Sequence, residues 1–186
     1  MSAKERQVLM DEEEVRETLR RMAHEIIERN EGTDRLLVLG IRRRGVELAE
    51  AIRAHIEEEG QVEIPSGALD ITLYRDDLMA VGPRPVVGES TLPLEGVDGR
   101  TVVIVDDVLF TGRTVRAAIN ELMDWGRPAR IDLCVLVDRG GRELPIQPDV
   151  VGRRAEVRPD QIIEVLVPEQ DGRLAVELVP RPENAA

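Results

Sequence analysis

The chain has 186 residues and a formal net charge of −12 at pH 7, which fits one domain, 1–186, with a full hydrophobic core. The acidic total argues against indiscriminate binding to nucleic acid or anionic membranes, and three aromatic residues are too few for a platform that stacks single-stranded nucleic acid. No apolar run reaches about 18 residues and the N-terminus is charged, so we expect a soluble, cytoplasmic protein without a membrane span. The lone Cys134 lies in an apolar run, which indicates core packing rather than a disulfide or a cysteine metal site.

The first part of the chain alternates helical and strand patterns. Residues 11–29 predict an amphipathic helix with Asp11 as N-cap and Glu14 at the capping-box position. Residues 36–39 predict a short strand, followed by the turn 40–45 with three consecutive arginines and by a second helix that ends near Gly60.

A strand is expected over 69–74. In the next segment, 75–100, the apolar residues follow neither the helical nor the strand spacing. That segment holds three prolines and four glycines. An irregular connection of this length in a compact domain predicts a mobile lid or hairpin.

The most informative segment is VVIVDDVLFTGRT, residues 102–114. Its first four residues are β-branched and predict a buried parallel strand, and apolar residues at helical spacing follow the Thr-Gly-Arg-Thr turn. The first N–H groups of a helix lack internal partners and the dipole is positive there, so a phosphate is expected on residues 111–114. Asp106 and Asp107 would then bind the hydroxyls of a sugar or the shell of a divalent cation. The alternative is a buried strand that ends in an acidic turn and a helix N-cap.

The rest of the chain adds apolar strands. Strands are expected over 131–137, 162–167 and 174–179, the last two joined by the turn 170–172. The sequence has neither the Gly-x4-Gly-Lys-Ser/Thr of a P-loop nor the Gly-x-Gly-x-x-Gly of a dinucleotide site. Alternating strands and helices predict an α/β fold with a parallel sheet, whose ligands lie at the carboxyl ends of the strands.

The segment 102–114 resembles the ribose-phosphate motif of the type I phosphoribosyltransferases, which bind 5-phosphoribosyl 1-pyrophosphate (PRPP). Nearly the whole chain is similar to the PyrR family, pyrimidine operon attenuation proteins that are also uracil phosphoribosyltransferases. The resemblance is carried by AHEIIERN (23–30), LDITLYRDDL (69–78), VDDVLFTGRT (105–114), WGRPARI (125–131) and VLVDRGGRELPI (135–146). It implies a type I phosphoribosyltransferase fold, a central mostly parallel sheet flanked by helices, with a flexible lid loop at about 75–100.

The resemblance also implies a reaction in which uracil and PRPP give UMP and pyrophosphate with Mg²⁺. The ion would be held mainly through PRPP and water and would have no direct protein ligand, unless Asp106 or Asp107 contacts it. The catalytic residues would be Arg75, Asp106 and Asp107. PRPP or nucleotide would contact Arg43, Arg44, Arg84, Asp106, Asp107, Val108, Leu109, Phe110, Thr111, Gly112, Arg113 and Thr114. The base would contact Val137, Asp138, Arg139, Gly140 and Ile163.

The family's RNA function implies a third set of residues. A pyrimidine operon leader mRNA, bound more tightly with UMP, would contact Arg20, Arg21, His24, Arg142 and Arg153. The sequence departs from the family pattern at four places: Arg20 and Arg43 each replace a usual Thr, Gly141 replaces a usual His, and residues 154–158 replace Asn-x-Pro-Thr-Ser. The family resemblance further implies a homodimer or a higher homo-oligomer.

Other readings of the same residues stay open. Arg42 to Arg44 also fit an exposed basic turn, and the charges on the first helix fit a solvated face. Two other functions fit as well: a phosphoribosyltransferase acting on a purine or another base without RNA binding, and an RNA regulator that senses PRPP or UMP and is catalytically weak.

Overall fold

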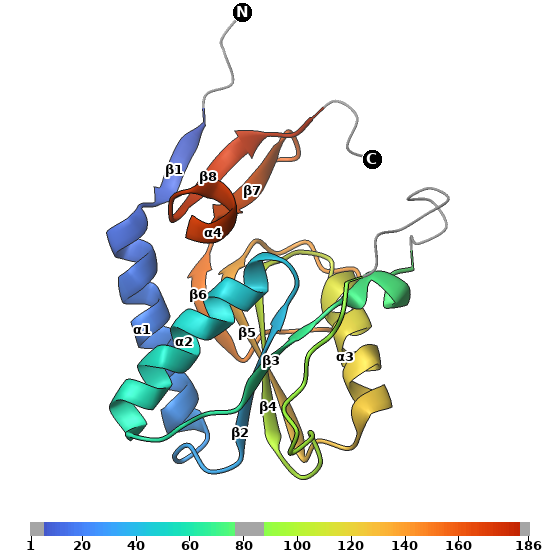
Figure 1. The fold of residues 1–186 in the computed structure, drawn as a ribbon. Coiled ribbons are helices and arrows are strands. Elements are labelled where there is room, and N and C mark those ends of the chain that lie inside the picture. Colours follow the sequence, from blue (N-terminus) through green and yellow to red (C-terminus); the bar gives the residue numbers. More distant parts are fainter. Residues whose placement is uncertain (1–5, 77–87, 183–186) are drawn as a thin grey trace, which may run out of the picture.

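The computed structural model describes residues 6–76 and 88–182, and these form two sheets of different kinds (Figure 1). The larger sheet has five parallel strands in the order β3-β2-β4-β5-β6. Its strands are β2 (Leu36–Ile41), β3 (Ser66–Leu69), β4 (Thr101–Leu109), β5 (Arg130–Asp138) and β6 (Val150–Arg154). The smaller sheet is antiparallel, in the order β1-β8-β7, and consists of β1 (Gln7–Met10), β7 (Gln161–Leu166) and β8 (Ala175–Pro180).

Helices cover both faces of the parallel sheet (Figure 1). Helices α1 (Glu12–Arg29) and α2 (Arg44–Gly60) lie on one face, and α3 (Arg113–Trp125) lies on the other. Successive strand residues point to opposite faces, so Val103 and Val105 enter the core under α1 and α2 while Val102 and Ile104 enter the core under α3. This double burial explains why the central strands are continuous apolar runs and confirms the predicted α/β fold class.

The first helix begins as the sequence predicts. The Asp11 side chain accepts a hydrogen bond from the Glu14 N–H, and the Glu14 side chain accepts one from the Asp11 N–H, each at 2.9 Å. This reciprocal capping box satisfies two N–H groups that the helix leaves without partners. The apolar stripe of the helix is buried, including Leu19, Met22 and Ile26.

Two predicted boundaries are wrong. The expected strand at 69–74 ends at Leu69, and residues Ile71–Tyr74 form a 3₁₀ helix, η1. The reason is Asp70, whose carboxylate accepts the Thr72 N–H at 3.0 Å and so offers the backbone a turn in place of a strand ladder. The strand expected at 102–105 continues to Leu109, so Asp106 and Asp107 lie within β4 and the chain reverses only at Phe110 to Gly112.

The sequence pattern missed β1 and β6, which are short. It found the two C-terminal strands, but these pair with each other and with β1 in the antiparallel sheet rather than extending the parallel one. A single turn of helix, α4 (Pro168–Asp171), joins them.

Three further expectations concern single features. Cys134 is fully buried in β5, as expected of a core residue. Of the expected lid, residues 88–100 carry one antiparallel bridge, between Thr91 and Ala68, and residues 77–87 lie outside the described chain. No helix among the described residues is long and apolar enough to cross a membrane.

Candidate active site

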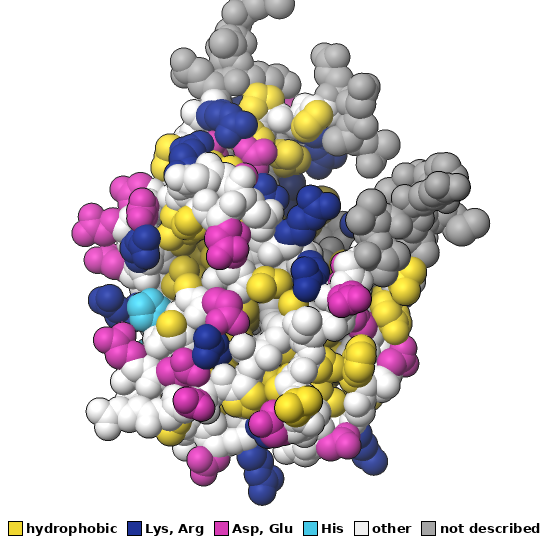
Figure 2. Space-filling model, in the orientation of Figure 1, with side chains coloured by type: hydrophobic (Ala, Val, Ile, Leu, Met, Phe, Trp, Pro, Cys, Tyr) yellow, Lys and Arg dark blue, Asp and Glu magenta, His cyan; other side chains and the backbone are white. Residues whose placement is uncertain are grey.

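A cavity of about 680 Å³ opens at the carboxyl ends of β2, β3 and β4. It is lined by Arg42, Arg43, Arg44, Asp70, Ile71, Thr72, Arg75, Gly88, Asp106, Asp107, Val108 and Thr114. Figure 2 shows basic side chains around the recess between the antiparallel sheet and the body of the molecule. Six lining residues belong to the predicted PRPP set, and a seventh, Arg75, is one of the predicted catalytic residues. Asp70, Thr72 and Gly88 were missed, although an Asp-x-Thr sequence after a strand is a recognisable capping signal.

Asp106 and Asp107 form the floor of this site at the end of β4. Asp106 is 5% exposed, and its Oδ1 accepts the Asp107 N–H at 3.0 Å, while Asp107 Oδ1 accepts the Val108 N–H at 2.8 Å. Burial raises the pKa of Asp106 well above its ordinary value, and the charge of Asp107 raises it further. Burial also raises the pKa of Asp107, against the Val108 N–H and the charge of Arg44, which lower it. The pair therefore resists full ionisation until hydroxyl donors or a cation approach.

The turn that follows β4 presents backbone N–H groups. Gly112 has φ of 92°, a left-handed conformation, and α3 begins directly after it at Arg113. The Arg113 N–H donates to Thr111 Oγ1 at 3.3 Å, and within the described chain no acceptor takes the N–H of Thr111, Gly112 or Thr114. Together with the positive end of the α3 dipole, these groups form an anion site suited to a phosphate.

The side chain of Arg113 is not part of that anion site. Its Nε donates to Glu143 at 2.7 Å and its Nη1 donates to Asp76 at 2.5 Å. These two ion pairs commit the guanidinium, so the contribution of Arg113 to a phosphate would come from its backbone. At Arg113 a phosphate contact stays a prediction, and it concerns the backbone N–H.

Residues 142–144, which follow β5, hold the phosphate turn in place by hydrogen bonds. The N–H groups of Glu143 and Leu144 donate to the Thr111 carbonyl at 3.0 and 3.1 Å. Arg142 donates to the carbonyls of Phe110 and Ile146 and to Asp138 Oδ1, at 3.0, 2.9 and 2.7 Å. With its side chain 14% exposed, Arg142 supports the phosphate turn, a role that the sequence reading, which placed it on an RNA face, did not foresee.

The arginine turn between β2 and α2 contributes the cations of the site. Arg42 and Arg43 are joined by a cis peptide bond, and α2 begins at Arg44. A Cβ atom on Gly45 would lie 2.6 Å from the carbonyl oxygen of Val105, so the first turn of α2 touches the backbone of β4 directly. This contact places the arginines next to the aspartates. Arg75 lines the same cavity, and Arg84 lies outside the described residues.

The residues predicted to bind the base follow β5 and lie beside this cavity rather than in its lining. Val137 is fully buried in the core, and Asp138 accepts the Gly140 N–H at 3.0 Å. The guanidinium of Arg139 lies 4.1 Å from the centre of the Phe110 ring, a cation–π contact, and burial lowers the pKa of Arg139. Ile163 lies on β7, partly buried against the core under α1 and α2.

The Phe110 ring explains why position 141, where the family usually has His, holds a glycine in this chain. A Cβ atom on Gly141 would lie 2.4 Å from the Phe110 ring, and Gly141 has φ of +79°. The aromatic ring therefore occupies the space that a side chain at position 141 would need. A His at this position would require Phe110 to move away from Arg139.

Four of the five predicted RNA residues lie on α1 and β6. Arg20, Arg21, His24 and Arg153 are exposed. Arg21 links the two elements by donating to the carbonyls of Val151 and Gly152, at 3.2 and 2.6 Å, and His24 Nδ1 lies 2.7 Å from Glu59 Oε1. Hydrogen bonding to Glu59 raises the pKa of His24. Arg142 is held apart from this group, under the phosphate turn.

Comparisons with known proteins agree with this geometry. Residues 9–171 match the phosphoribosyl transferase domain family. The chain is 53% identical over 163 residues to the bifunctional protein PyrR of Herpetosiphon aurantiacus, covering 88% of this chain and 90% of that one. It is 49% identical over 170 residues to the bifunctional protein PyrR of Deinococcus radiodurans, covering 91% and 92%.

Solved structures share the fold. A Trypanosoma cruzi hypoxanthine phosphoribosyltransferase has a TM-score of 0.71 at 22% identity, with 96% of this chain and 97% of that chain covered. A hypoxanthine-guanine phosphoribosyltransferase from Bacillus anthracis has a TM-score of 0.66 at 19% identity, with 94% and 97% covered. At this level of identity the likeness to the solved structures concerns the fold alone. The relatives of about 50% identity identify the family within that fold. The chain therefore belongs to the PyrR family of phosphoribosyltransferases.

Proposed function

We propose that this chain transfers the 5-phosphoribosyl group of PRPP to uracil, giving UMP and pyrophosphate, and that it regulates a pyrimidine operon by binding leader mRNA. One observation carries the enzymatic part. The aspartate pair of β4, the arginine turn and Thr114 of the phosphate turn line one cavity at the carboxyl edge of the parallel sheet. A second pocket, lined by Thr111 and Arg113 of the same turn, shares Arg75 and Thr114 with it. The chain is also about half identical to proteins named bifunctional PyrR.

In this reaction the N1 atom of uracil, which releases its proton to solvent, forms a bond to C1 of the ribose as the bond from C1 to pyrophosphate breaks, and positive charge develops on the ribose ring. The phosphate turn at 111–114 holds the 5-phosphate. Asp106 and Asp107 accept the ribose hydroxyls, and their negative charge stabilises the cation-like ring. Arg43, Arg44 and Arg75 neutralise charge on the leaving pyrophosphate. The protein thus works by positioning the reactants and by electrostatic stabilisation.

The donor set fits a hard divalent cation such as Mg²⁺. Carboxylate oxygens of Asp106 and Asp107 reach the cavity, but no group of three or more His, Cys, Asp or Glu side chains in the described chain could hold an ion alone. An ion would therefore be held largely by PRPP oxygens and water, with Asp106 or Asp107 as the protein's contribution. When bound, it would neutralise charge on pyrophosphate.

The test is incubation with PRPP, Mg²⁺ and each of uracil, hypoxanthine, guanine and adenine, with nucleotide and pyrophosphate measured in each case. We expect UMP from uracil and no purine nucleotide. Formation of a purine nucleotide in place of UMP would favour the alternative transferase. Absence of any nucleotide, together with retention of RNA, would favour a regulator that has lost catalysis.

RNA binding is proposed for the face formed by α1 and β6, where Arg20, Arg21, His24 and Arg153 lie. The test is a gel shift of the leader stem-loop with and without UMP. We expect UMP to strengthen retention and Arg20→Glu to weaken it. Arg127→Glu, which makes the same charge change at an exposed position after α3, is the control. Equal effects of the two substitutions would show that only total charge matters.

We further propose that the chain forms a homodimer or a larger homo-oligomer. Size-exclusion chromatography with light scattering measures this directly. A mass equal to that of one 20.8 kDa chain at micromolar concentration would contradict it.

A further inference from the structure

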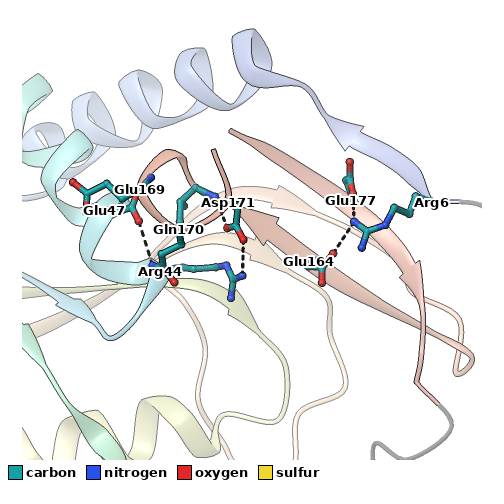
Figure 3. Close-up of polar contacts among 9 residues, drawn as sticks. Arg6, Arg44, Glu47, Glu164, Glu169, Gln170, Asp171 and Glu177 are labelled. Carbon is teal, nitrogen blue, oxygen red and sulfur yellow. Dashed lines mark hydrogen bonds and ion pairs between the residues drawn. The ribbon is translucent and has the colours of Figure 1, made fainter. Parts of the chain in front are cut away.

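The arginine turn of the candidate site is tied to the antiparallel sheet through α4 (Figure 3). Arg44 Nη2 donates to Asp171 Oδ1 at 3.3 Å. One helical turn further along α2, Glu47 accepts the Glu169 N–H and the Gln170 side-chain amide, both at 3.2 Å. Two residues of the first turn of α2 are therefore held by three consecutive residues of α4.

The carboxylate of Asp171 is itself fixed in place. Its Oδ2 accepts the N–H of Val167, the residue before α4, at 2.9 Å, so one oxygen is bound at the start of the helix while the other faces Arg44. The Val167 N–H and the charge of Arg44 lower the pKa of Asp171, so the carboxylate stays ionised beside the guanidinium. A carboxylate held by the backbone N–H of a residue four positions earlier is a rigid partner for a long, flexible arginine.

Arg44 needs such a partner because it lies between two acidic groups. It lines the cavity, its charge lowers the pKa of Asp107, and its Nε is buried without an acceptor among the described residues. Without Asp171, the guanidinium would be free to turn onto the aspartate pair. That contact would neutralise the carboxylates needed for the ribose and would withdraw a cation from the pyrophosphate.

We propose that Asp171 is a positioning residue for PRPP binding, which holds the guanidinium of Arg44 at the cavity wall beside Asp107. The antiparallel sheet would thereby contribute to PRPP affinity through a residue outside the cavity lining. This inference rests on the proposed use of PRPP. Glu47 would serve a different purpose, since its two bonds to α4 anchor the helix end without contacting Arg44.

The test compares Asp171→Asn with wild type. Asn keeps an oxygen for the Val167 N–H and removes the charge that faces Arg44. The side chains of Arg44 and Asp171 are 33% and 21% exposed, so we expect the modest effect of a partly exposed ion pair. The KM for PRPP, and the Kd for PRPP with Mg²⁺, should each rise about threefold to fivefold. The KM for uracil and kcat should change by less than about twofold.

Two further variants separate positioning from a general loss of structure. Glu164→Gln removes a carboxylate of β7 that pairs with Arg6 at 2.9 Å, apart from Arg44 and Asp171 (Figure 3), and should leave PRPP binding unchanged. Asp171→Glu restores the charge and should recover at least half of the lost affinity. In an Arg44→Gln background, Asp171→Asn should cause no further loss, because the partner is already gone.

Each outcome is decisive. Unchanged PRPP binding in Asp171→Asn, or a loss that simply adds to that of Arg44→Gln, would overturn the inference. A large fall in melting temperature without recovery in Asp171→Glu would assign Asp171 to folding instead, and also overturn it. If wild type binds neither PRPP nor pyrophosphate with Mg²⁺, the proposed function itself fails, and that result is distinct from the others.

Discussion

The contact between Gly45 and β4 makes a sharp prediction for Gly45→Ala. The added Cβ atom would lie 2.6 Å from the Val105 carbonyl oxygen, where ordinary contacts begin at 3.4 Å. The backbone fixes the position of a Cβ atom, and the carbonyl belongs to the backbone, so neither can rotate away and α2 must withdraw from β4 by about 0.8 Å. The arginine turn would move with it, away from the aspartate pair. Because a displacement of about 1 Å can cost about a hundredfold in rate, we expect kcat/KM for PRPP to fall about tenfold to a hundredfold.

Stability should change much less in this variant. Overpacking costs about 1–3 kcal/mol, and Ala is better than Gly within a helix by about 1 kcal/mol, so the two effects partly cancel. The assays are initial rates of UMP formation over a range of PRPP concentrations and urea unfolding. Gly60→Ala is the control, because at the other end of α2 the nearest neighbours of the new Cβ would be side-chain atoms of Thr33 and Val62, the closest two at 3.1 and 3.3 Å. Wild-type kcat/KM in Gly45→Ala would refute the argument that this contact sets the position of the arginines.

Three further predictions concern the aspartates and the turn after β5. Asp107→Asn should abolish PRPP turnover while RNA retention without nucleotide survives in a gel shift; unaffected turnover would remove Asp107 from the site. Asp106 has a raised pKa in the folded protein, so its stabilising effect is complete below its ordinary pKa of about 4 and is lost as the pH rises through the raised value. Asp106→Asn should therefore be more stable than wild type at about pH 8, with an advantage in urea unfolding that shrinks towards pH 4. Gly141→Ala should lower the free energy of unfolding by about 1 kcal/mol more than Gly140→Ala, because both positions have positive φ but only Gly141 faces the Phe110 ring. Equal losses would show that Phe110 moves aside freely.

The parts of the fold that depend on local sequence were predictable. The capping box at Asp11 and the strand, acidic pair and glycine turn around 102–114 are written in adjacent residues, and the structure has them nearly where the patterns indicate. The cavity also gathers residues that the motif and the arginine turn named in advance. Local signals suffice where the chemistry of a turn is set by its own residues.

The parts that depend on distant partners were not predictable. Nothing in residues 161–180 says that these strands pair with Gln7–Met10 in a separate sheet, because strand pairing is a long-range choice. Arg142 was assigned to an RNA face from the family resemblance, but its acceptors lie up to 32 residues away in the chain. The contact between Arg44 and Asp171 spans 127 residues and has no sequence signature.

The buried thiol of Cys134 can report on local opening of the parallel sheet. The thiol is the only one in the sequence, lies at the centre of β5 with no exposed surface, and has a pKa raised by burial. A thiol-modifying reagent can reach it only when the middle of the parallel sheet separates. The rate at which the reagent labels the unmodified chain would therefore measure how often the sheet opens locally. It would also measure how far PRPP or UMP suppresses that opening, without any engineered label.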